Sequence, residues 1–369
     1  MPAILPDQLR MLRLQAQQLY PAAGRGDLAG VVERLCGVNA QQESTMMLSL
    51  RARIRGLEPG DVRDAIGRRA LVRGWAMRGT LHLMPSRDLR WIVPLVGPGI
   101  LARNIRRQRE LGLTAGTVTE GLAVIDALLT PRGTLTRGDL VEGLVGKAGI
   151  PGEGQAAYHI LFAAGMTGLI CRGPDTPSGE ETFRLTREWI GGPDPLPRTE
   201  ALDALIRRYL DGYGAAGVED FSSWSGLPPG EAREGWRRVQ REGGITEVRV
   251  GDRILLSPET RPVPEGVPRV PAVSLLPSFD TLVLGYHHRE QVVPGPYRDR
   301  VYHGGQTVPV VLVNGAAAGT WRYDRRGKTL DVSVTPFERF DTVTRNLIRE
   351  EAEDVGRIFG LPARVSFPS

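Results

Sequence analysis

The segment ALVRGWAMRGTLHLM, residues 70–84, carries the clearest local structural signal in the chain. Residues 70–77 and 80–84 are mostly apolar, as expected for short half-buried strands. Arg78-Gly79 lies between them, and glycine readily adopts the positive φ that tight hairpin turns require. The segment therefore predicts two strands joined at Arg78-Gly79.

Three helical patterns precede this hairpin. Asp27 is placed to cap a helix over residues 28–35, whose apolar side chains recur at helical spacing, and Gly37 is placed to end it. Ser44 opens a second helix, and residues 62–66 form a third. Because three helices followed by a hairpin is the order of a winged-helix unit, we predict such a unit here.

The same order recurs twice more along the chain, which predicts duplicated modules. In the second module, residues 136–139, Thr-Arg-Gly-Asp, resemble a capping box that starts a helix, and a hairpin follows at 169–172 and 182–185. In the third module, Gly251-Asp252 joins strands at 245–250 and 253–256. The further predicted helices lie at 118–129, around 158–162, and at 201–210, 218–225 and 230–241.

Prolines at positions 262, 264, 268 and 271 indicate a linker, because proline removes backbone hydrogen-bond donors. Beyond it, short β-like runs predict a small sheet or partly closed barrel, followed by a helix at 340–359 and an edge strand at 363–367. The predicted class is α+β, with winged-helix units at 1–115, 116–197 and 198–265 and a barrel-like β-rich domain at 266–369. The β-like runs are 273–276, 282–285, 308–313, 318–323 and 329–334.

Composition narrows the classes of function. The net charge of +5 and pI of about 9.5 permit attraction to a polyanion. Nearly all the positive charge is arginine, which suits phosphate contacts, but a genome rich in arginine codons would explain this predominance equally well. Cys36 and Cys171 are expected to be buried thiols, and the five histidines lack the spacing of a zinc site. No apolar run is long enough to span a bilayer and no signal peptide is evident, so we expect a cytoplasmic protein without a metal.

Asn39-Ala40-Gln41 follows the first predicted helix. Residues two apart face the same way only in extended backbone, so both side-chain amides would converge on one point there. The alternative is that the two side chains cap neighbouring backbone groups, as polar residues between helices often do.

A second polar group lies on the predicted hairpin of residues 70–84. Alternation would place Thr80 and His82 on one face of the second strand, with Arg78 at the turn. This face could grip a phosphate or line a pocket. The alternative is a structural role for His82 within the strand.

The third group combines residues 275–280, Leu-Leu-Pro-Ser-Phe-Asp, with Tyr286, His287, His288 and Arg289. Asp280 could act as a base or orient Arg289, and the aromatic residues could stack on nucleic acid. The alternative is a corner of the β-rich domain held by an aspartate–arginine pair.

Together, and in this order, the three groups resemble the winged-helix DNA glycosylase superfamily of the AlkZ and AlkX type, over essentially the whole chain. The family's Arg-Gly-Thr-Leu-His wing is matched by residues 78–82, and its Leu-Pro-x-Phe-Asp segment by residues 276–280. Residues 304–321 also resemble the sequences of this family. The family's Gln-x-Gln or Gln-x-Asp motif is matched at Gln41, whereas Asn39 is one methylene shorter than the usual glutamine.

The resemblance implies a monofunctional DNA glycosylase that hydrolyses the N-glycosidic bond of alkylated purines, bulky adducts or interstrand crosslinks included. It assigns catalysis to Asn39 and Gln41 and DNA contacts to the other two groups. The implied partner is double-stranded DNA carrying alkylation damage, bound by a monomer without a cofactor or a membrane. A non-catalytic, regulatory DNA-binding protein is the alternative, because winged helices often serve regulation and the first motif departs from the family.

Overall fold

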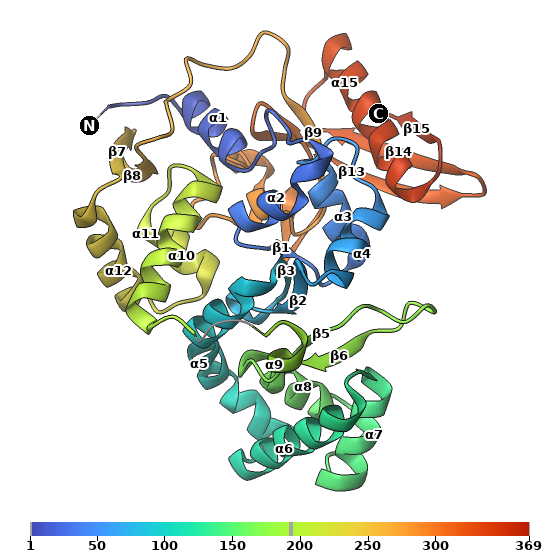
Figure 1. The fold of residues 1–369 in the computed structure, drawn as a ribbon. Helices are drawn as coiled ribbons and strands as arrows, with labels where there is room; N and C mark the ends of the chain where they lie inside the picture. The colour runs from blue at the N-terminus through green and yellow to red at the C-terminus, as the bar shows by residue number, and fades with distance from the viewer. Residues whose placement is uncertain (1, 192–194, 369) are drawn as a thin grey trace. The chain divides into compact units, whose positions relative to one another are not determined.

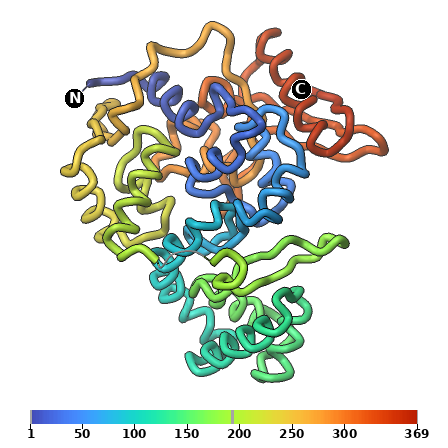
Figure 2. Tube along the Cα trace, viewed as in Figure 1, coloured from blue at the N-terminus to red at the C-terminus, as the bar shows by residue number. Residues whose placement is uncertain are grey.

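A computed structural model describes residues 2–191 and 195–368 of the protein. The chain divides into two compact units. Unit 1 contains residues 1–61, 205–224 and 229–369, and unit 2 contains residues 62–204 and 225–228. Each unit is therefore assembled from segments that are distant in sequence, as the ribbon and the Cα trace show (Figures 1 and 2).

The first two predicted helices are confirmed as α2 (Leu28–Arg34) and α3 (Glu43–Arg51), and α1 (Pro6–Ala16) precedes them. The third corresponds to α4 (Pro59–Gly67). Gly37 ends the α2 segment with a φ of 102°, a conformation that favours glycine. The prediction for Asp27 was wrong in one respect: it occupies the N-cap position of α2, but its side chain accepts no capping hydrogen bond, because a 3-10 turn (Arg25–Asp27) leads into the helix.

The hairpin predicted at residues 70–84 is confirmed in unit 2. β2 (Leu71–Trp75) pairs antiparallel with β3 (Leu81–Pro85), with Trp75 opposite Leu81. The connection is longer than a two-residue turn, because residues 77–79 form a 3-10 turn in which Arg78 has a φ of 57°. Thr80 consequently lies before the strand and not within it.

The rest of unit 2 alternates helices with short strands. The capping box at Thr136 is confirmed: the Thr136 hydroxyl accepts from the Asp139 N–H, and the Asp139 carboxylate accepts from the Thr136 N–H. Within unit 2 the strands lie in the order β3, β2, β5, β6, β4. The elements are α5 (Ser86–Glu110), α6 (Ala115–Arg132), β4 (Leu135–Thr136), α7 (Arg137–Ala148), α8 (Ala156–Met166), β5 (Ile170–Arg172), β6 (Thr182–Leu185) and α9 (Thr186–Trp189).

The third predicted set of helices and its hairpin are also present. They are α10 (Arg198–Tyr213), α11 (Val218–Ser225), α12 (Pro229–Glu242), β7 (Ile245–Val250) and β8 (Arg253–Pro258). Gly251, with a φ of 57°, forms the turn between β7 and β8, as expected. Val248 and Leu255 of this hairpin share a small core with Leu9 and Leu12 of α1. Segments of unit 1 that are distant in sequence thus stabilise each other.

The C-terminal sheet is open, so the prediction of a barrel-like domain was wrong. Its strand order is β15, β14, β13, β12, β9, and the two edge strands are not paired with each other. Instead of closing on itself, the sheet buries one face against α15 (Figure 1), where Trp321 and Val332 pack on Ile348 and Val355. The elements are β9 (Val273–Leu276), β12 (Val310–Val313), β13 (Ala316–Arg326), β14 (Thr329–Pro336), α15 (Thr342–Phe359) and β15 (Ala363–Ser366).

The prediction of a strand at residues 282–285 was also wrong. These residues belong to a short helix, α13 (Thr281–Leu284), because the Asp280 carboxylate accepts a hydrogen bond from the Leu282 N–H at 2.9 Å and so caps it. The remaining small elements are η3 (Gly295–Tyr297), α14 (Arg298–Val301), β10 (Tyr302–His303) and β11 (Gln306–Thr307).

Cys36 and Cys171 are buried free thiols, as expected. In the part of the chain that the structure describes, no single helix is both long and apolar enough to cross a membrane, although α5 and α6, bent by 106° at their junction, meet these criteria as a pair.

Candidate active site

Asn39 and Gln41 lie in unit 1 between the end of α2 and the start of α3, Asn39 in a short strand and Gln41 at the bend that precedes α3. β1 (Val38–Asn39) has the extended backbone that brings residues two apart to one side. The Asn39 side-chain Nδ2 donates to the Gln41 Oε1 at 3.4 Å, so the two amides meet. Asn39 is buried, with 7% of its surface exposed, whereas Gln41 is exposed.

Asn39 also organises the backbone of this segment. Its Oδ1 accepts a hydrogen bond from the Gln41 N–H at 3.2 Å, which is the backbone-capping role considered as the alternative. The two roles are therefore combined in one side chain. The Asn39 Oδ1 accepts from the Gln41 backbone, and the Asn39 Nδ2 holds the Gln41 side chain at its Oε1. Asn39 therefore sets the orientation of the exposed Gln41 amide.

The side chains of residues 78–82, in and after the turn between β2 and β3, differ from the polar face that alternation predicted. His82 is buried, with 4% of its surface exposed, and its Nδ1 donates to the Thr80 carbonyl at 2.9 Å. Burial, and secondarily the charge of Arg78, lower the pKa of His82 to about 4, so the ring is neutral at pH 7. Thr80 is half-buried and its hydroxyl donates to the Met77 carbonyl at 3.2 Å. Arg78 is half-buried in the turn.

Asp280 anchors α3 to the C-terminal part of unit 1. It is buried, with 1% of its surface exposed, and its two oxygens each lie 2.8 Å from a guanidinium nitrogen of Arg53. The Ser49 hydroxyl of α3 donates to the same carboxylate at 2.7 Å. The prediction that Asp280 orients Arg289 was therefore wrong, because both carboxylate oxygens are taken by Arg53, two residues beyond the end of α3. The alternative, a structural aspartate–arginine pair, is present with Arg53 as the arginine.

Residues 286–289 divide between the core and the surface. Tyr286 is buried, and its hydroxyl donates to the Tyr213 carbonyl at 2.6 Å, so its ring is not available for stacking from solvent. His287 is exposed and His288 half-buried, and their backbone N–H groups both donate to one oxygen of Asp220. The Arg289 guanidinium lies over the Tyr302 ring, 4.6 Å from its centroid.

Two buried residues that the sequence analysis missed hold these groups in place. Arg53 fixes Asp280, and Asp220, which is fully buried, fixes His287 and His288. Arg53 lies just beyond an apolar helix, where a buried cation needs a buried partner. Sequence alone offered no means of matching it to an aspartate more than two hundred residues away.

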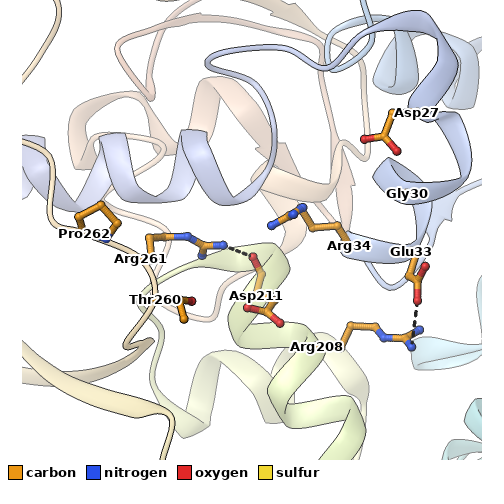
Figure 3. A pocket seen from close by; sticks show the side chains of 9 residues that line it. All are labelled: Asp27, Gly30, Glu33, Arg34, Arg208, Asp211, Thr260, Arg261 and Pro262. Atoms are coloured by element: carbon orange, nitrogen blue, oxygen red, sulfur yellow. Dashed lines mark hydrogen bonds and ion pairs between the residues drawn. The ribbon is translucent and has the colours of Figure 1, made fainter.

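A cavity of about 700 Å³ in unit 1 contains none of the residues predicted for the site (Figure 3). Three arginines and three carboxylates line it, so its formal charges balance. Arg208 lies 3.5 Å from Glu33, and Arg261 donates to the Leu210 and Asp211 carbonyls. The lining therefore favours neither sign of ligand charge.

The chain belongs to a class of DNA repair enzymes. The family model described as "DNA glycosylase AlkZ-like" matches residues 32–358, and the protein is a member of this AlkZ-like DNA glycosylase family. Membership defines it as a monofunctional DNA glycosylase.

Two comparisons with Streptomyces sahachiroi agree with this assignment. The chain is 30% identical to an interstrand DNA cross-link repair glycosylase of that organism, over 96% of this chain and 97% of the relative. It also matches the solved structure of the S. sahachiroi DNA glycosylase AlkZ with a TM-score of 0.82 and 26% identity, covering 99% of this chain and all of the other. The likeness thus extends over both units.

Proposed function

We propose that this glycosylase hydrolyses the N-glycosidic bond of purines alkylated at N3 or N7 in double-stranded DNA. Such a purine already carries a positive charge, so it departs with the electrons of the glycosidic bond without a strong general acid. Water adds to C1′ of the sugar and releases a proton to solvent, which leaves an abasic site. The enzyme must chiefly position this water and stabilise the sugar cation.

The contact between the Asn39 and Gln41 side chains is the observation that carries this proposal. Two neutral amides joined by a 3.4 Å hydrogen bond supply oxygen acceptors that can orient a water, and their dipoles favour a developing cation. The exposed Gln41 amide is the group that would contact the water, and the buried Asn39 amide would orient Gln41. Asn39 would thus substitute for the glutamine usual at this position in the family.

DNA contacts are proposed for the polar residues that solvent reaches. Arg78, Thr80, His287, His288 and Arg289 are exposed or half-buried, which supports this role. His82 would serve by fixing the turn that carries Arg78, since its neutral ring bonds to Thr80. Each of the three helix groups is followed by a hairpin, and we infer three tandem winged-helix units that together bind duplex DNA in the cytoplasm.

The relative from S. sahachiroi is named for interstrand crosslink repair, and we propose that bulky adducts and crosslinks are substrates here too. Most glycosylases flip the base into a closed pocket, which would exclude such lesions. Gln41 is exposed to solvent, which supports recognition on an open surface.

The proposal is tested by incubating the protein with duplexes that carry N7-methylguanine or an N7-linked interstrand crosslink. Alkali then cleaves any abasic sites. We expect strand breaks only after alkali treatment, and only in alkylated DNA. Unmodified duplex is the control. No breaks in either alkylated duplex, despite measurable DNA binding, would overturn the proposed substrate class.

A further inference from the structure

Two arginines of unit 2 share one tryptophan ring. The guanidinium carbon of Arg184 lies 4.1 Å from the centroid of the Trp189 ring, and that of Arg69 lies 4.6 Å from it. Both distances are within the range of cation–π attraction. One tryptophan ring is therefore in contact with two positive charges.

Three different elements bring these side chains to one place. Arg184 lies in β6, where its neighbour Phe183 enters the core and Arg184 points to the other side of the strand. Trp189 ends the short helix α9 that follows β6, and it is buried. Arg69 lies just beyond the end of α4 with a φ of 61°, and its side chain is exposed. The arrangement thus depends on an unfavourable backbone conformation at Arg69.

The positive charge of this group is not compensated by the described part of the chain. Neither Arg69 nor Arg184 forms an ion pair there, whereas the nearby Arg187 lies 2.6 Å from Asp126. Burial, and secondarily the charge of Arg69, lower the pKa of Arg184. No carboxylate offsets these effects, so an external anion would relieve the repulsion between the two guanidinium groups.

Two hydrogen-bond donors in this group also lack partners. The Arg184 Nε and the Trp189 Nε1 are both buried and form no hydrogen bond within the described residues. A buried donor without an acceptor is unfavourable, because it has lost its hydrogen bonds to water and gained none in the fold. Neither side chain therefore finds an acceptor for this N–H group within the described part of the fold.

We propose that Arg69 and Arg184, stacked on Trp189, bind a phosphate group of the DNA backbone. The guanidinium fork matches phosphate oxygens in geometry as well as charge, and stacking orders both side chains before the ligand arrives. Inorganic phosphate offers the same oxygens as a free ion. The assignment to DNA rests on the proposed function, because a glycosylase must hold the duplex on both sides of a lesion.

The test is a salt titration of duplex binding by the full-length protein. We compare the wild type with Arg69→Gln, Arg184→Gln and the double variant. Each phosphate contact contributes about 0.9 to the slope of log affinity against log salt concentration. If the arginines share one phosphate, the double variant lowers the slope by about 0.9, and the two single variants are not additive. Arg187→Gln is the matched control, since Asp126 already neutralises Arg187.

The outcomes separate this inference from the proposed function. A slope unchanged in the double variant, while wild type still binds and excises, overturns the contact with the DNA backbone and leaves the proposed function intact. A wild type that binds no duplex overturns both. Protection of the wild type, but not of the double variant, against thermal unfolding by millimolar inorganic phosphate, together with an unchanged DNA slope, assigns the site to free phosphate and overturns the DNA assignment.

Discussion

Asn39 stands where the motif that this chain resembles usually has glutamine, and its geometry makes the difference testable. Its Oδ1 caps the Gln41 N–H while its Nδ2 bonds to the Gln41 side chain. A glutamine at position 39 keeps the amide and extends it by one methylene. We expect Asn39→Gln to retain or raise the rate of excision, as measured under single-turnover conditions. A variant that folds and binds DNA normally but loses excision would contradict this role for the amide.

His82 makes a prediction about pH. Its pKa in the folded protein is about 4, below the 6.5 of an ordinary histidine, because the ring is buried. The unfolded chain therefore gains a proton that the folded protein does not as pH falls below 6.5. The stability that the neutral His82 contributes is therefore fully present above pH 6.5 and is lost as pH falls toward 4. Between pH 7 and pH 5 the free energy of unfolding falls by about 2 kcal/mol on this account.

The comparison of wild type with His82→Gln isolates this effect, because glutamine does not titrate. Urea unfolding at pH 7 and pH 5 measures the free energy of unfolding of both proteins. We expect the wild type to lose about 2 kcal/mol more than the variant over this interval. Equal losses would mean that the ring is accessible to protons in the folded protein.

Sequence reasoning worked at the residue scale wherever local backbone geometry decided the outcome. The capping box at Thr136 and the meeting of Asn39 with Gln41 needed only spacing and an extended segment. It failed where the burial of a side chain decided whether a ligand could reach it. His82 and Tyr286 have the side chains of ligand-binding residues, yet both lie in the interior, because their polar atoms bond to backbone carbonyls.

At the scale of elements, α3 and α13 are joined by the buried pair of Arg53 and Asp280. Loss of one partner leaves an unpaired buried charge, which typically destabilises a protein by about 3–5 kcal/mol. We expect Asp280→Asn to lower the free energy of unfolding by about 3 kcal/mol. Urea denaturation measures this change.

The matched control for Asp280→Asn is Asp61→Asn, which breaks an exposed pair with Arg25. Exposed pairs contribute about 1 kcal/mol or less, so this variant should remain close to wild type. Addition of Arg53→Met to Asp280→Asn should restore part of the lost stability, because the unpaired cation is removed. Similar losses for Asp280→Asn and Asp61→Asn would show that the buried pair does not hold α3 in place.

The order of elements was more predictable than their closure or their long-range partners. Hairpins at β2 and β3 and at β7 and β8 followed from turn residues between apolar runs. The open C-terminal sheet did not, because closure depends on whether β9 and β15 pair, and that is decided by the packing of α15 on the sheet. Helix α5 was not predicted, since Pro94 and Pro98 lie inside it.

At the scale of the whole molecule, the family, the fold and the amide pair converge on one activity. The family model spans residues 32–358, and the structural match covers 99% of the chain. The first motif is the only one of the three matched motifs in which a residue differs from the family pattern. Whether the amide pair positions water therefore decides whether this account of catalysis holds.

The most direct measurement is the single-turnover rate of N7-methylguanine excision by wild type and Gln41→Ala, with duplex affinity determined in parallel. We predict that excision falls by more than about tenfold, equivalent to roughly 1.4 kcal/mol of transition-state stabilisation, while affinity stays nearly constant. An excision rate unchanged by Gln41→Ala would contradict the proposed role of the amide pair.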